Sequence, residues 1–72
     1  MTYNQSSNIR VRFGIYLFVR RVPADVRRYY RGDWVSISLR TNSVRAANRA
    51  DQSINQRLDD YWYGLRLRKM ID

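Results

Sequence analysis

The sequence predicts an α+β domain in which a three-stranded antiparallel sheet packs against one long C-terminal α-helix. Two β-rich runs separated by Phe13-Gly14 predict a hairpin. Residues 34–40 alternate apolar and polar side chains, as a half-buried strand does. From Val44 onward, apolar residues recur every three or four positions, which is the spacing of one helix face. Together these observations predict the element order β-β-β-α.

The hairpin is predicted to have strands at residues 9–12 and 15–22, and it ends at Pro23, which has no N–H to donate. Its register has two possibilities, because a shift of one residue turns every side chain to the other face. With an odd-numbered loop, the side chains that face inward are Ile9, Val11, Ile15, Leu17 and Val19. The side chains that face outward are then Arg10, Tyr16, Phe18 and Arg20. A two-residue turn instead places inward Ile9, Val11, Tyr16, Phe18 and Val22. We favour the first register because it buries all the aliphatic side chains.

The connection at residues 24–33 is predicted to hold about one turn of helix between Pro23 and Gly32. The strand that follows has two faces. Its inward residues are Val35, Ile37 and Leu39. Its outward residues are Trp34, Ser36, Ser38 and Arg40.

The long helix is predicted to begin after the capping residue types Thr41-Asn42-Ser43. Its apolar stripe consists of Val44, Ala47, Ala50, Ile54, Leu58, Tyr61 and Leu65. We expect the domain to span residues 9–65, after a disordered arm at 1–8 and before a C-terminal tail or linker start at 66–72. The stripe and the inward strand face would bury each other. The other face of the sheet has nothing left in the chain to cover it, so function is expected there.

Charge indicates the class of partner. The chain has 14 basic and 6 acidic residues, for a net charge of +8, and 13 of the basic residues are arginine. The planar guanidinium group of arginine forms paired hydrogen bonds with phosphate and guanine. An excess of basic over acidic residues of this size indicates a polyanionic partner. Residues 9–40 hold eight arginines against two aspartates, so the charge concentrates on the sheet and its loops. Candidate phosphate contacts from the loop and the first helical turn are Arg27, Arg28 and Arg45.

Residue content argues against catalysis. The chain lacks histidine, cysteine and glutamate, and its three glycines build no phosphate loop. We therefore expect no enzyme activity, cofactor, metal or small-molecule substrate. The longest apolar run, Ile15 to Val19, is far shorter than the roughly 20 residues of a membrane span, and no secretory signal is evident. We expect a cytoplasmic, nucleoid-associated protein with no membrane partner.

Three segments resemble phage-type integrases of the tyrosine recombinase family. The run from Tyr16 to Arg27, with Arg-Arg-Val-Pro-Ala-Asp at its centre, is similar to a segment near the start of those proteins. Ser38-Leu39-Arg40-Thr41 with the alanines that follow, and Leu58-Asp59-Asp60-Tyr61-Trp62, resemble the next two segments. The resemblance covers roughly residues 9–65 and is to the N-terminal region of the family.

The resemblance implies a sheet-on-helix domain that binds arm-type sites on double-stranded DNA during site-specific integration. It implies DNA-reading roles for residues of the sheet, namely Arg10, Arg12, Tyr16, Arg20, Arg21, Ser36, Ser38 and Arg40. The catalytic region of such recombinases is absent from this chain, which is expected to be either a fragment or a stand-alone protein. Other integrase domains or recombination accessory proteins would be further partners.

Two alternatives remain open. A small stand-alone regulator would act through protein contacts of the helix, whose end carries Tyr61, Trp62, Tyr63, Leu65 and Leu67. Single-stranded nucleic acid or RNA would instead stack on exposed aromatic side chains of the sheet.

Overall fold

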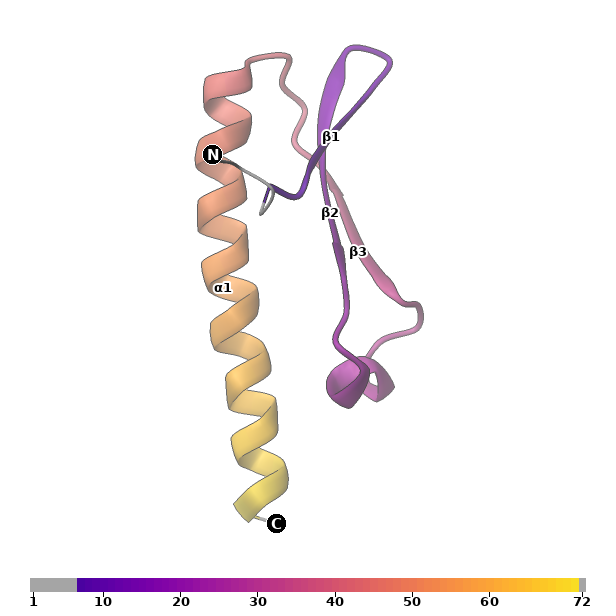
Figure 1. The fold of residues 1–72 in the computed structure, drawn as a ribbon, viewed down its shortest axis with the longest axis vertical. Coiled ribbons are helices and arrows are strands. Elements are labelled where there is room, and N and C mark those ends of the chain that lie inside the picture. Colours follow the sequence, from indigo (N-terminus) through magenta and orange to yellow (C-terminus); the bar gives the residue numbers. More distant parts are fainter. Residues whose placement is uncertain (1–6, 72) are drawn as a thin grey trace.

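The structure, a computed structural model, describes residues 7–71 and confirms the predicted α+β fold (Figure 1). Its elements are β1 (Ile9–Arg12), β2 (Ile15–Arg21), the 3₁₀ helix η1 (Ala24–Tyr29), β3 (Trp34–Ser38) and α1 (Val44–Ile71). The strands form one antiparallel sheet in the order β1-β2-β3. Helix α1 runs along one face of this sheet, and the other face is turned away from it (Figure 1). Of the arm expected at residues 1–8, positions 1–6 lie outside the described residues.

Helix α1 begins at a capped end, because the Ser43 Oγ accepts a hydrogen bond from the Ala46 amide at 3.2 Å. Its 28 residues give a length of about 42 Å at 1.5 Å per residue, close to the 44 Å long dimension of the molecule. The helix continues through Ile71, past residue 65 where the domain was expected to end. Between residues 7 and 71, no helix is both long enough and apolar enough to cross a membrane.

The main core lies where the C-terminal half of α1 meets the end of β2 and η1. It consists of Val22, Val26, Trp62 and Leu65. The predicted helix stripe is wrong at two positions, since Tyr61 and Val44 are 56% and 58% exposed. Trp62 takes the buried place instead, because its indole N–H donates a hydrogen bond to the Tyr30 hydroxyl at 2.8 Å.

The hairpin has the two-residue register, so the register favoured from the sequence is wrong. Arg12 pairs with Ile15 across the turn, and the φ values of 54° at Phe13 and 78° at Gly14 match a two-residue hairpin turn. The turn length fixes which side chains face the helix, and the inward set includes Phe18, which is fully buried. The aliphatic residues Ile15, Leu17 and Val19 consequently face outward.

Strand β3 is shorter than predicted and ends at Ser38 rather than at residue 40. Val35 and Ile37 lie opposite Arg20 and Phe18 and share their helix-facing side, as predicted. Beyond Ser38 the ladder is interrupted by Arg40, whose φ is 54°. The hydrogen bonds on either side of it run from the Leu39 amide to the Tyr16 carbonyl and from the Tyr16 amide to the Thr41 carbonyl, both at 3.0 Å. The strand alternation therefore does not extend to Arg40.

Candidate nucleic-acid interface

The candidate site is the face of the sheet that points away from α1, called the outer face below. Paired residues of neighbouring strands share a face, so the buried Phe18 fixes the parity of all three strands. The outer face consists of Arg10, Arg12, Ile15, Leu17, Val19, Arg21, Trp34, Ser36 and Ser38. Within residues 7–71, no helix or strand packs over it.

The outer face has an aliphatic centre with polar sides. In one row across the strands, Leu17 of β2 lies between Arg10 of β1 and Ser38 of β3. In the next row, Val19 lies opposite Ser36. A hollow of about 370 Å³ lies here, with β1 residues on one side and Ser36 of β3 on the other. It is lined by Arg10, Val11, Arg12, Leu17, Val19 and Ser36. The hollow offers donors on both sides of an apolar floor.

One end of the outer face carries a cation–aromatic pair. Arg21 and Trp34 are direct partners across β2 and β3, and the Arg21 guanidinium carbon lies 5.6 Å from the centre of the indole ring. Trp34 is 55% exposed, so this pair is open to solvent. A cation held over an aromatic ring keeps its charge and its donors, and it is positioned by the ring.

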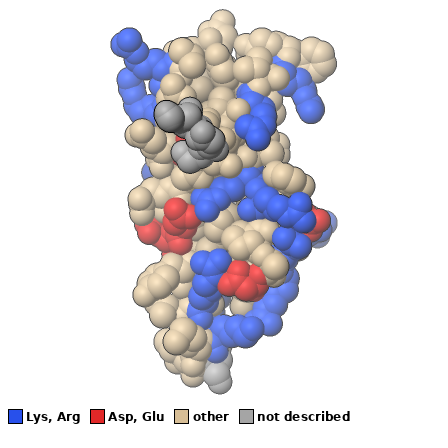
Figure 2. Space-filling view, viewed as in Figure 1, with Lys and Arg blue, Asp and Glu red and all other residues tan. Residues whose placement is uncertain are grey.

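The acidic residues of the described chain lie outside the strands that form the outer face. None of the three strands contains one, and the ion pairs found between residues 7 and 71 join Arg20 to Asp59, Arg27 to Asp33 and Arg66 to Asp25. In the view of Figure 2, the larger acidic patches lie beside basic side chains. Hydrogen bonds from Arg66 lower the pKa of the Asp25 carboxyl below its usual value. The same described residues contain no group of three or more side chains suited to hold a metal.

Five of the predicted DNA-reading residues lie together on the outer face, namely Arg10, Arg12, Arg21, Ser36 and Ser38. Tyr16 and Arg20 do not, because the two-residue register turns both toward the helix. Arg40 is exposed but lies beyond the end of β3 in a left-handed conformation, outside the strand alternation that placed it with the others.

The predicted phosphate contacts have different environments. Arg27 is half-buried and donates to the Val22 carbonyl at 2.9 Å, so it fixes η1 to the end of β2 rather than facing solvent. Arg28 is exposed beside the ring of Tyr29, with its guanidinium carbon 5.3 Å from the ring centre. Arg45 is exposed in the first turn of α1. Arg28 and Arg45 are therefore the exposed members of this predicted set, and Arg28 also donates to the Tyr29 hydroxyl at 3.3 Å.

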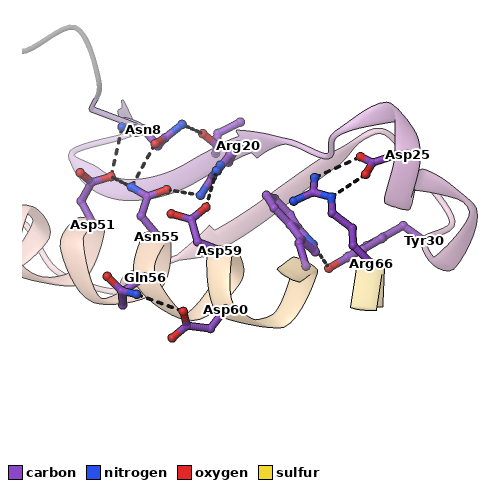
Figure 3. Close-up of polar contacts among 12 residues, drawn as sticks. Asn8, Arg20, Asp25, Tyr30, Asp51, Asn55, Gln56, Asp59, Asp60 and Arg66 are labelled. Carbon is purple, nitrogen blue, oxygen red and sulfur yellow. Dashed lines mark hydrogen bonds and ion pairs between the residues drawn. The ribbon is translucent and has the colours of Figure 1, made fainter. Parts of the chain in front are cut away.

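Arg20 belongs to a polar network that joins the sheet to α1 (Figure 3). Its guanidinium donates to Asn55 Oδ1 at 2.7 Å and to Asp59 Oδ1 at 2.8 Å, and it lies 4.7 Å from the centre of the Trp62 ring. Asn55 in turn donates to Asn8 Oδ1 and Asp51 Oδ1, both at 3.1 Å. Arg20 is therefore a structural residue. This network was not predicted from the sequence, although Asp51, Asn55 and Asp59 are spaced by four beside the apolar stripe.

Residues 8–67 match a sequence family described as a domain of unknown function, DUF6538. The chain belongs to the DUF6538 family. The family match begins at Asn8, which anchors the first strand, and it covers the whole sheet and most of α1. No curated protein and no solved structure matches the chain.

Proposed function

We propose that this DUF6538 domain binds double-stranded DNA through its outer face. The observation that carries the proposal is a surface with three arginines, Arg10, Arg12 and Arg21, and no carboxylate among the strands that form it. The described acidic side chains that form ion pairs do so with other arginines. An uncompensated basic surface of this kind attracts the phosphate backbone of nucleic acids.

The chemistry of the outer face suits the major groove of B-DNA, which admits β-strands. Arginine donates two hydrogen bonds to the O6 and N7 of guanine, and serine pairs with several bases. The aliphatic centre formed by Ile15, Leu17 and Val19 suits the methyl groups of thymine, which lie in the same groove. Arg10 and Ser38 on either side of Leu17 would then contact base edges or phosphates.

Duplex DNA fits this face better than single strands do. Single-strand binding relies on several aromatic side chains that stack on successive bases. Tyr16 and Phe18 face the helix, so Trp34 is the aromatic residue that the outer face offers among the described strands. One indole that is already covered in part by Arg21 is a poor stacking platform.

The resemblance to phage-type integrases supports a more specific role, as the arm-site-binding domain of a tyrosine recombinase. The centre of the first resembling segment, from Arg20 to Asp25, forms the turn from β2 into η1 and includes the buried Val22. In this role the domain contributes binding and positioning during DNA integration, and the chemistry of strand exchange belongs to other parts of the recombinase.

The test is fluorescence anisotropy of a labelled duplex, titrated across salt from ~50 to ~200 mM with unlabelled single strand as competitor. We expect duplex to compete better than single strand. The double variant Arg10→Ala, Arg12→Ala should bind at least roughly tenfold more weakly and reduce the salt slope by about 2, since each phosphate contact contributes about one unit.

The matched control is Arg49→Ala, which removes an exposed arginine from the side of α1 opposite its buried stripe. Its affinity should stay within about twofold of the parent protein, which is the change expected when one distant charge is removed. Equal losses in the control and in the outer-face variant would contradict a localised interface. Absence of duplex binding even at low salt would overturn the proposal.

A second candidate function, protein binding through the C-terminal end of α1, is supported by a separate observation. Exposed apolar side chains gather there, namely Tyr61, Tyr63, Leu67, Met70 and Ile71. The last turns also border an apolar hollow of about 290 Å³ between η1 and α1. Light scattering across a concentration series tests self-association through this end. A mass that stays monomeric, together with intact DNA binding, would favour the first proposal.

A further inference from the structure

The tip of the β1–β2 hairpin presents an aromatic side chain to solvent. Phe13 is 95% exposed, the highest exposure among the large apolar residues described. Gly14 follows it, and a Cβ built at Gly14 would meet no atom within 4 Å, so the tip is open on that side. The ring of Phe13 therefore contributes almost no packing to the fold.

The backbone at this position disfavours the residue that occupies it. Phe13 has a φ of 54°, in the left-handed region where bulky side chains are genuine outliers. Two-residue hairpin turns of this kind prefer asparagine or glycine at such positions. Phe13 thus combines a strained backbone with an exposed ring, and strain without any packing benefit points to a role in binding.

The surroundings of Phe13 indicate what the ring would contact. It directly follows Arg12 of the outer face, and Arg10 lies two residues farther along β1. On the other side of the turn, Ile15 is 37% exposed. Proteins that bind the minor groove of DNA place an apolar side chain beside basic ones in this way and insert it as a wedge between base steps.

We infer that Phe13 is a wedge that inserts between adjacent base pairs of duplex DNA at the edge of the surface bound by the outer face. This inference rests on the proposed function, since the arginines must first bring the tip to the duplex. It adds a distortion of the DNA, which contact through the sheet face alone does not require. Flexible pyrimidine–purine steps, which unstack easily, would be the preferred place of insertion.

The experiment compares two labelled duplexes of identical sequence, one fully paired and one with a single central mismatch. A mismatch lowers the free energy needed to unstack a step, so a wedge protein binds the mismatched duplex more tightly. We expect a preference of roughly tenfold for the parent protein, since unstacking costs a few kcal/mol per step and 1.4 kcal/mol corresponds to a factor of ten.

Two variants at the tip test whether the aromatic ring is required. Phe13→Asn removes the ring and suits the backbone, so it should raise the Tm by about 4–8 °C and abolish the preference for the mismatch. Phe13→Tyr keeps an aromatic ring at the same place and should retain the preference. Because Phe13 makes so few contacts, neither variant should prevent folding.

The outcomes distinguish this inference from the proposed function. If Phe13→Asn binds both duplexes as the parent protein does, while Arg10→Ala, Arg12→Ala weakens binding, the wedge is refuted and binding through the outer face stands. If the parent protein shows no preference for the mismatch, the wedge is likewise refuted. If the parent protein binds neither duplex, both ideas fail together.

Discussion

The arginines of this chain fall into two groups that composition alone does not separate. Arg20, Arg27 and Arg66 form ion pairs with aspartates and join elements of the fold. Arg10 and Arg12 project from the outer face, where no strand supplies a carboxylate among the described residues. A net charge of +8 therefore predicts a polyanionic partner, but only the contacts of each guanidinium tell which arginines are available to it.

Arg20→Ala is predicted to weaken folding rather than binding. The change removes hydrogen bonds to Asn55 and Asp59 and the contact over the Trp62 ring. Because Asp59 is largely exposed, we expect a loss of about 1–2 kcal/mol, toward the low end for charged hydrogen bonds. Urea denaturation measures this free energy of unfolding. Unchanged stability with lost DNA affinity would instead mean that Arg20 is a binding residue.

The reciprocal prediction concerns Arg10→Ala, which should leave the free energy of unfolding within about 0.5 kcal/mol of the parent value. Among residues 7–71, the Arg10 guanidinium donates to the carbonyl of its neighbour Ile9 and to no other element. The same urea titration checks this value. A loss as large as that of Arg20→Ala would contradict the division of the arginines into two groups.

At the scale of elements, the sequence predicts which elements form and which side of β3 faces the helix, but it does not predict which side of the hairpin does. The hairpin, η1, β3 and α1 all follow from local pattern, turn residues and caps. The hairpin register does not, because it depends on the backbone of Phe13, a residue atypical of a two-residue turn. The network around Arg20 joins residues 35 and 39 positions apart, and no local pattern reveals such partners. Part of the candidate site was therefore assigned to the correct face and part to the wrong one.

The packing of α1 against η1 and β2 depends on one of the two tryptophans. Trp62 is 1% exposed, so Trp62→Ala should cost about 3–5 kcal/mol and abolish cooperative unfolding in a domain this small. Trp34→Ala is the matched control, because Trp34 lies on the outer face at 55% exposure and should leave the thermal transition in place. Circular dichroism during heating compares them. A cooperative transition in Trp62→Ala would contradict the assignment of the core.

The ion pair between η1 and α1 predicts a pH dependence. Arg66 lowers the pKa of Asp25 in the folded state, so the pair stabilises the fold above the unfolded pKa of about 4 and this stabilisation is lost as pH falls through the folded pKa. Asp25→Asn should lower the Tm slightly at pH 7, and the difference from the parent protein should shrink below pH ~4. A difference that persists at low pH would assign the effect to something other than this carboxylate.

At the scale of the whole molecule, α1 and the two faces of the sheet have different roles. The helix packs on one side of β1 and β2 and supplies Trp62 and Leu65 to the main core. The outer face of the sheet is left without a covering layer in the described chain (Figure 1). The aliphatic centre of that face, with Leu17 and Val19, would otherwise be an exposed apolar surface. A partner that covers both apolar and basic groups, such as the major groove, accounts for both features at once.

The most direct test of this account maps the bound surface by NMR, with ¹⁵N-labelled protein titrated with a short duplex. If the outer face binds DNA, amide shifts should concentrate in its strands, at Arg10, Leu17, Val19, Ser36 and Ser38, with little change along the exposed side of α1 around Arg49. Shifts confined to the last turns of α1, from Tyr61 to Ile71, would contradict it and make the helix end the binding surface.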